Sequence, residues 1–528
     1  MPCPSSCPPG LLALMAPGLA LMATFSLPSQ AGDRRALPVE KPPGVKGRTL
    51  ILLDVNTKSP VRIISENFLS LQLDPSIIHD GWLDFLSSRR LVTLARGLAP
   101  AFLRFAGKRT DFLQFHNVKN PAKSRGGPGP DYYLKNYEDA RSLDKLYNFA
   151  DCSGLHLIFA LNALRRNPNN SWNSSNALSL LKYSASKKYN ISWELGNEPN
   201  NYRTLIGRSV NGSQLGKDYI QLRSLLQLIR TYSRANLYGP NIGRPRKNVI
   251  ALLEGFMKVA GSTVDAVTWQ HYYIDGRVAK VTDFLKTRLL DTLSDQTRKI
   301  QKVVNTYTPG KRIWLEGVGM TSAGGMNNLS DSYAAGFLWL NTLGLLASQG
   351  IDVVVRHSFL DHGHNHLVDQ NFNPLPDYWL SLLYKRLIGP KVLAIHVAGL
   401  QRKPRPGRVI RDKLRIYAHC TSYHNHNYVR GSITLYIINL HRSRKKIKLA
   451  GTLRDKIVHQ YLLQPYGKDG LHSRSVQLNG QPLAMVDDAT LPELKPRPLR
   501  PGRTLVIPPL TMSFYVVKNV NALACRYR

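Results

Sequence analysis

Residues 189–200 read Y-N-I-S-W-E-L-G-N-E-P-N, and this stretch decides the fold. Its first half carries the β-branched and aromatic residues typical of a buried strand, and Gly-Asn-Glu-Pro ends that strand abruptly. Glu198 is therefore expected on a stiff turn at the rim of a sheet, where catalytic groups often gather. A carboxyl group at such a rim can meet a substrate and still have a raised pKa, as a general acid requires. The alternative is an ordinary loop glutamate.

Strands and helices alternate on both sides of this stretch. Amphipathic segments at 215–233, 284–307 and 330–349 separate strands that are predicted at 66–73, 101–107, 155–162, 191–196, 236–242, 264–273, 312–317 and 351–359. Eight such units predict an α/β fold, a closed (β/α)₈ TIM barrel over 64–389, in which Glu198 ends the fourth strand. Residues 117–139 are polar and rich in Gly and Pro, which predicts a basic, linker-like loop within the barrel.

The helical pattern ends near residue 389. Short strands joined by basic turns are predicted at 414–420, 432–440, 446–449, 456–463, 504–507 and 513–517. They indicate a C-terminal β-sandwich domain over 390–528. The N-terminal segment 32–63 contains a further strand at 48–55, which lies outside the count of eight and could add to the sandwich.

The N-terminus has the pattern of a secretory signal. An uncharged apolar run at 11–27 precedes Ser29-Gln30-Ala31, a small-x-small cleavage pattern, so a signal peptide is predicted over 1–31. An uncleaved anchor is the alternative, but Pro17 interrupts a run that is short for a span of about 20 residues. No transmembrane segment is predicted later in the chain. Five N-x-S/T sequons suit a secreted glycoprotein: Asn169, Asn173, Asn190, Asn211 and Asn328.

Charge is the second main feature of the 528-residue chain. Lys and Arg number 71 against 34 Asp and Glu, a formal net charge of +37, which implies a polyanionic partner. Nucleic acid is the usual partner of such a chain, but a secreted protein meets sulfated glycosaminoglycans instead, so no nucleic acid is expected. The basic clusters are G-R-P-R-K at 243–247 with Arg244, Arg246 and Lys247, R-K-P-R-P-G-R at 402–408, and R-S-R-K-K at 442–446. A set of solvated faces is the alternative.

Several motifs extend along almost the whole chain. They include L-A-R-G-L-A-P-A-F-L-R-F at 94–105, W-E-L-G-N-E-P-N at 193–200, Y-G-P-N-I-G at 238–243 and V-T-W-Q-H-Y-Y at 267–273. With them the sequence resembles glycoside hydrolase family 79, the heparanases. The resemblance implies a retaining endo-β-glucuronidase scaffold that needs no metal and no other cofactor. It also implies that Glu198 occupies the acid/base position, with Asn197 beside it to bind a sugar 2-hydroxyl.

The second carboxylate departs from the family pattern. Active heparanases end the seventh strand in W-L-G-E-T, whereas this chain has W-L-E-G-V at 314–318. The position aligned with the nucleophile is therefore Gly317, and the nearest acid, Glu316, comes one residue early. Because side chains alternate along a strand, the offset predicts that Glu316 turns away from the nucleophile's side and forms a structural ion pair under the rim. A bulge before Glu316 that re-aims its carboxylate is the alternative.

The substrate loops also differ from the family. The heparanase loop A-Y-G-G-G becomes Ser322-Ala323-Gly324-Gly325, and G-N-Y becomes Gly363-His364-Asn365, so two tyrosines are lost while Gly324, Gly325 and Gly363 remain substrate-binding candidates. This pattern resembles the branch of the family that is regarded as binding heparan sulfate without cutting it.

The favoured interpretation is a secreted pseudoenzyme of the extracellular matrix and cell surface. It would bind heparan sulfate, heparin and heparan sulfate proteoglycans, and would compete with active heparanase. The cluster at 243–247 aligns with a heparin-binding segment of the family. The alternative is a working endo-β-glucuronidase in which Glu198 is the acid/base and Glu316 the nucleophile.

Cysteines and histidines complete the list of candidate site residues. The resemblance implies a Cys420–Cys525 disulfide, and it pairs Cys152 with a cysteine in a segment that is absent here between Asp139 and Ala140. The chain thus resembles a shortened form, and maturation at the linker of that segment is not expected. With Cys3 and Cys7 assigned to the signal, Cys152 is expected to be unpaired.

Two histidine groups do not match a common zinc spacing, so no metal is expected: His362, His364 and His366, and His419, Cys420, His424 and His426.

Overall fold

The structure is a computed structural model that describes Cys3 and residues 50–79, 82–116, 137–277, 279–321, 325, 329–360, 363, 365–398 and 413–527. Within these residues eight parallel strands close a barrel, in the spatial order β10-β11-β12-β3-β4-β7-β8-β9. The strands are β3 (Leu69–Leu73), β4 (Ala101–Phe105), β7 (Leu155–Leu161), β8 (Ile191–Leu195), β9 (Leu237–Ile242), β10 (Ala266–Ile274), β11 (Ile313–Thr321) and β12 (Val353–Leu360). Each lies at a predicted strand, and the predicted TIM barrel is confirmed.

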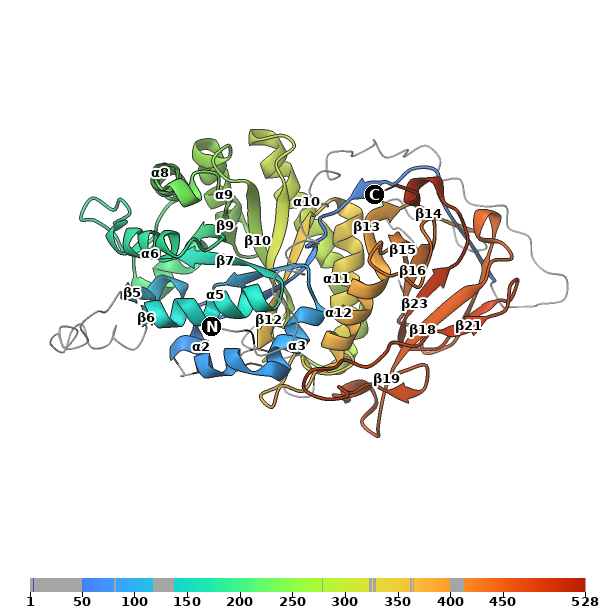
Figure 1. Cartoon of the computed structure of the whole chain (residues 1–528). Coiled ribbons are helices and arrows are strands. Elements are labelled where there is room, and N and C mark those ends of the chain that lie inside the picture. Colours follow the sequence, from blue (N-terminus) through green and yellow to red (C-terminus); the bar gives the residue numbers. More distant parts are fainter. Residues whose placement is uncertain are drawn as a thin grey trace.

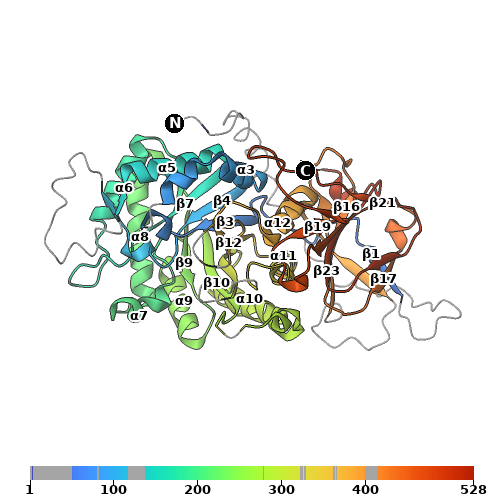
Figure 2. The same ribbon diagram turned by 90° about the horizontal axis from the view of Figure 1, so that it is seen from below.

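Helices surround the barrel, as Figures 1 and 2 show. They are α2 (Ser76–His79), α3 (Arg89–Gly97), α5 (Ala140–Cys152), α6 (Ser175–Ser186), α7 (Tyr202–Ile206), α8 (Gly212–Leu228), α9 (Lys247–Ala260), α10 (Thr287–Tyr307), α11 (Ala335–Gln349) and α12 (Pro376–Leu387). Helix α11 is buried almost all round because it lies between the barrel and the C-terminal sheets (Figure 1). Gly336 allows this packing, since a Cβ there would come within 2.5 Å of Met512 in the C-terminal domain.

The C-terminal domain consists of two sheets. A four-stranded sheet has the order β14 (Ile395–Ala398), β1 (Ile51–Val55), β17 (Lys445–Leu449) and β22 (Leu505–Ile507). The larger sheet joins β2 (Arg62–Ile63), β13 (Ile388–Leu393), β15 (Leu414–Thr421), β16 (Ile433–Asn439), β23 (Thr511–Val517), β18 (Val458–Pro465), β19 (Val476–Leu478) and β20 (Gln481–Pro482), and β21 (Arg497–Leu499) pairs with β18.

An apolar core fills the space between these two sheets. Leu53, Ile437, Ile447 and Val517 belong to this core, whereas Phe514 on the opposite face of the larger sheet belongs to the core that includes α11 and α12. The larger sheet is therefore covered on both faces, which explains why every residue of its central strand β16 is buried. The strand β1 comes from the N-terminal segment and lies between β14 and β17.

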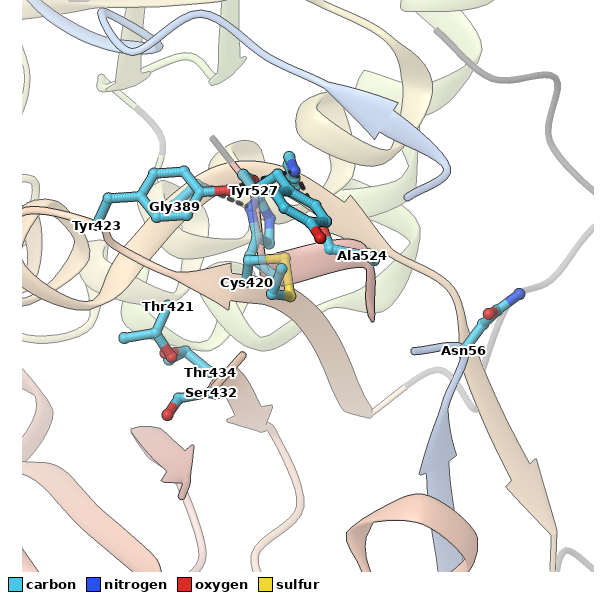
Figure 3. The surroundings of a disulfide bond; sticks show 12 residues. Asn56, Gly389, Cys420, Thr421, Tyr423, Ser432, Thr434, Ala524 and Tyr527 are labelled. Atoms are coloured by element: carbon cyan, nitrogen blue, oxygen red, sulfur yellow. Dashed lines mark hydrogen bonds between the residues drawn. A yellow bond between two sulfur atoms is a disulfide. The ribbon is translucent and has the colours of Figure 1, made fainter. Parts of the chain in front are cut away.

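Two disulfides link cysteines among the described residues. Cys420 on β15 is bonded to Cys525, near the C-terminus, as the resemblance implied. Figure 3 shows this bond beside the C-terminal residues, where the Lys391 ammonium donates to the carbonyl of Ala524 at 2.9 Å. In the full-length chain Cys152 is bonded to Cys3. The expectation of an unpaired Cys152 concerns the chain after cleavage of residues 1–31, which would remove Cys3, and it stays a prediction.

Several predicted features fall wholly or partly outside the described residues. These are the signal peptide apart from Cys3, most of the loop at 117–139, the cluster at 402–408, Ser322 to Gly324, Asn328, His362 and His364. The end of that loop forms β6 (Tyr137–Asp139), which pairs with β5 (Gln114–His116). Among the described residues, no helix is both long enough and apolar enough to cross a membrane.

Candidate active site at the carboxyl end of the barrel

Glu198 stands on a sharply shaped turn directly after β8. Gly196 has φ +82° and leaves no room for a side chain, because a Cβ there would lie 2.1 Å from the hydroxyl oxygen of Tyr202. Glu198 itself adopts the left-handed conformation, with φ 49° and ψ 63°. Its amide donates to the main-chain carbonyl and the Oδ1 of Asn241, each at 3.1 Å. Hydrogen bonds to Asn241, the residue before the end of β9, thus hold a backbone conformation that a glutamate rarely adopts.

The surroundings of Glu198 suit a proton donor. The side chain is half-buried, and burial raises its pKa against the opposing effects of Asn201, Lys108 and Arg104. Gly243 allows the carboxylate to approach the chain after β9, since a Cβ there would lie 2.9 Å from Glu198 Oε1. This geometry agrees with the expected position at the rim.

Asn197 is fixed from two sides. Its amide donates to Asp111 at 3.0 Å, and its Oδ1 accepts from Arg104 Nη2 at 3.1 Å. Asp111 also accepts from the amide of Ala163 at 2.8 Å, and burial raises the pKa of Asp111 to about 6. The residue beside the candidate acid is therefore locked to β4 and to the loop that follows it.

Glu316 points into the barrel, contrary to the predicted orientation. Its Oε1 lies 3.0 Å from Nε of Arg104 on β4 and accepts from Nδ2 of Asn241 on β9 at 3.0 Å. Because β4 and β11 are separated by two strands, their side chains can meet only in the barrel interior. Strands β11 and β12 pair without a break from Trp314 to Glu316, so no bulge before Glu316 re-aims it. The prediction of an ion pair is nevertheless confirmed.

A second buried acid shares this ion pair. Glu194 on β8 accepts from the same Arg104 Nε at 3.1 Å, and the side chains of Arg104, Glu194 and Glu316 are all 0% exposed. Burial raises the pKa of Glu194 well above its usual range, and the nearby Glu316 raises it further, although Arg104 opposes both effects. The raised pKa favours the protonated form of Glu194, whose hydroxyl can donate a hydrogen bond to the nearby Glu316. Glu316 Oε2 has no other hydrogen-bond partner within the described residues. We call Arg104, Glu194 and Glu316 the barrel-core triad.

Gly317 occupies the position that aligns with the nucleophile. It has φ +100°, and the register of β11 against β12 shifts between Glu316 and Val318. A Cβ on Gly317 would lie 3.2 Å from Gln270 Cγ, so a side chain here would be strained by its backbone and tightly packed. Moving the acid by exchanging Glu316 and Gly317 would thus require the local backbone to change.

The basic cluster at 243–247 lies between β9 and the start of α9. Arg246 and Lys247 are exposed, whereas Arg244 is half-buried. With the Gln296 amide oriented to donate to His271, its oxygen accepts from Arg244 Nε at 3.1 Å and Nη2 at 2.9 Å. Burial, with a further contribution from Arg246, lowers the pKa of Arg244. Two of the three predicted cations are therefore open to a polyanion, and Arg244 supports the loop.

The remaining candidates lie in different places. Gly325 is packed against Asn365, and Gly363 lies in the same loop region after β12 as Asn365. His419 is buried and contacts the Gly389 carbonyl and the Tyr436 hydroxyl, each at 2.9 Å, while His424 lies 3.3 Å from Glu66. No cluster of potential metal ligands occurs among the described residues.

Sequence reasoning missed Arg104, Glu194 and Asp111. A signal for Arg104 was present in A-F-L-R-F at 101–105, because a charge within an otherwise apolar buried strand requires a partner. The same holds for Glu194 in I-S-W-E-L. The sequence pattern does not show that these two residues and Glu316 face one another.

Comparisons with known proteins identify glycoside hydrolase family 79 proteins as relatives of this chain. Residues 136–344 match the family model described as glycosyl hydrolase family 79, N-terminal domain. The chain is 79% identical over 582 aligned positions to inactive heparanase-2 of Homo sapiens, covering 100% of this chain and 98% of that protein. It is 45% identical over 512 positions to heparanase of Mus musculus, covering 90% and 94%. The first alignment is longer than this chain, so the human protein carries residues without a counterpart here.

Solved structures support the fold. The crystal structure of a 4-O-α-L-rhamnosyl-β-D-glucuronidase from Fusarium oxysporum superimposes with a TM-score of 0.63. The match covers 88% of this chain and 100% of that one at 12% sequence identity. At this identity the match shows a shared architecture only.

Proposed function

The chain belongs to the heparanase family, glycoside hydrolase family 79, and we propose that it is a catalytically inactive member that binds heparan sulfate. The observation that carries the proposal is Gly317 at the aligned nucleophile position, with no carboxylate of its own. A retaining mechanism needs two carboxyl groups about 5–5.5 Å apart on either side of the glycosidic bond. Glu198 can act as one of these groups.

Glu316 does not replace the second group. Its carboxylate is fully buried, accepts from Asn241 and is paired with Arg104. An attacking oxygen must reach a sugar carbon, which a side chain with 0% exposure does not. Glu198 alone could protonate a leaving oxygen, but no covalent intermediate would follow.

Binding of a sulfated polysaccharide is supported by charge. The excess of 37 positive charges exceeds what solubility requires, and Arg246 and Lys247 are exposed at the start of α9, shortly after Gly243, which packs against Glu198. Sulfates and carboxylates on heparan sulfate would contact these cations through charge-assisted hydrogen bonds. Heparan sulfate that is bound to this protein would be inaccessible to active heparanase. This competition is the regulatory role that we propose.

Secretion belongs to the same proposal. An apolar leader with a small-x-small site precedes the barrel, and the asparagines of four sequons, Asn169, Asn173, Asn190 and Asn211, are exposed. These features support a glycosylated protein of the extracellular matrix that is held at the cell surface by proteoglycans.

We expect the protein to elute from a heparin column at high salt, with retention that falls steeply as salt is added. Arg246→Glu with Lys247→Glu should elute at lower salt, because reversal of two exposed charges replaces attraction to the sulfates by repulsion. The control is Lys299→Glu with Lys302→Glu, two exposed cations on α10 that belong to none of the clusters. Equal retention of both variants would remove the 243–247 cluster from the binding site, and no retention of the parent would refute the proposed function.

A further inference from the structure

The strand β17 presents cations from a rigid sheet. Its sequence is K-K-I-K-L, and Ile447 and Leu449 are buried in the core of the sandwich. Because side chains alternate along a strand, Lys446 and Lys448 point away from that core, about 7 Å apart. Hydrogen-bonded pairing with β1 on one side and β22 on the other fixes the backbone that carries them.

Further cations lie at the start of this strand. Arg442 and Arg444 are exposed in the turn before β17, and Lys413 is brought beside them because its carbonyl accepts from the amide of Leu440 at 2.7 Å. The pKa of His441 is lowered to about 4, mainly by burial, with smaller contributions from the nearby Lys445 and Lys413. We call Lys413, Arg442, Arg444, Lys446 and Lys448 the β17 basic surface.

Acidic residues do not neutralise this surface. In the four described strands of this sheet, Asp54 on β1 is the only acidic residue. Its Oδ1 accepts hydrogen bonds from the backbone amide of Thr452 at 3.2 Å and from the Thr452 hydroxyl at 2.8 Å. The five cations make no salt bridge within the part of the chain that the structure describes. Like charges placed along one face repel one another and destabilise the sheet. A polyanionic ligand would relieve this repulsion.

The two basic surfaces lie on different domains. Arg246 and Lys247 stand at the start of α9 on the barrel, whereas β17 lies at the far end of the sandwich (Figure 2). A short oligosaccharide on one surface would therefore leave the other surface open.

We propose that the β17 basic surface is a second binding site for sulfated polysaccharide, so that one protein molecule holds two separate segments at once. This inference rests on the proposed binding of heparan sulfate. If both sites bind segments of one long polysaccharide chain, the second site binds at a high effective concentration and the overall affinity rises. If the segments belong to two polysaccharide chains, the protein cross-links those chains. The protein would then organise heparan sulfate as well as occupy it.

The test is the number of heparin octasaccharides bound per protein, measured by titration calorimetry at low salt. We expect two for the parent and for the control Lys299→Glu with Lys302→Glu. We expect one for Lys446→Glu with Lys448→Glu, one for Arg246→Glu with Lys247→Glu, and none for the four changes together. Lys446→Gln with Lys448→Gln should also lose one site, and matching circular dichroism spectra would show that the folds are intact.

Two results would overturn the inference: a single site in the parent, or two sites in the β17 variants. A parent that binds no octasaccharide at all would instead overturn the proposed function itself. The measurement therefore distinguishes a failure of the second-site inference from a failure of the proposed function.

Discussion

Replacing Glu316 by glutamine is expected to lower the free energy of unfolding by about 3–5 kcal/mol, the usual cost of removing one partner from a buried ion pair. Arg104 would keep its charge at 0% exposure and would be left with Glu194, whose raised pKa favours its neutral form. Glutamine has the same shape as glutamate, so the substitution leaves no cavity. The loss of free energy of unfolding would therefore measure the effect of removing the charge.

The matched control is the same substitution at Glu194. The raised pKa favours a neutral Glu194, so Glu194→Gln replaces one neutral group by another and should cost less than about 1 kcal/mol. Equilibrium unfolding in urea at neutral pH, followed by circular dichroism, compares the two variants. Equal losses, or a larger loss at Glu194, would contradict the assignment of the proton in the barrel-core triad.

pH gives a second expected difference between the variants. The folded-state pKa of Glu194 lies above its unfolded value, so the parent loses stability as pH rises from about 4.3 through the folded-state pKa. Glu194→Gln removes this group and should flatten that part of the stability profile.

Removing the Cys420–Cys525 disulfide should have a similarly large effect. The bond closes a separation of 105 residues, and the chain-entropy model assigns such a loop up to about 4–5 kcal/mol. Near this bond the ammonium group of Lys391 donates to the backbone carbonyls of Ala524 and Tyr527. Cys420→Ala with Cys525→Ala should therefore unfold at a much lower urea concentration than the parent, and the parent in reductant should behave similarly.

Peptide mapping without reduction checks the pairing behind this prediction. A peptide that links Cys420 to Cys525 is expected, and any chain that retains Cys3 should also show Cys3 linked to Cys152. A bond from Cys152 to either C-terminal cysteine would refute both pairings.

The sequence was sufficient for the barrel because each strand has its own local signal. Eight apolar runs with amphipathic stretches between them defined the order of elements, and the turn of Glu198 followed from Gly196 and Pro199. The strands β13 and β14 were not predicted. Both follow α12 closely, and Pro390 interrupts the apolar pattern of β13.

The candidate site was less predictable because it depends on contacts across the barrel. The offset of Glu316 suggested an outward side chain, yet Trp314 and Glu316 both face inward, and the bulge lies after them at Gly317. Arg104 and Glu194 are 90 residues apart in sequence, and only barrel closure brings them together. Arg244 was predicted to bind a polyanion together with Arg246 and Lys247, and its contact with the distant Gln296 could not be predicted from the sequence.

The size distribution of heparan sulfate after long incubation with the protein tests the loss of catalysis most directly. We expect no shortening with the parent or with Glu198→Gln, while active heparanase alone fragments the same sample and does so more slowly when excess parent protein is present. Fragments that form with the parent protein and are lost with Glu198→Gln would contradict this account, because they would require a working acid/base and a nucleophile that we assign to neither Glu316 nor Gly317.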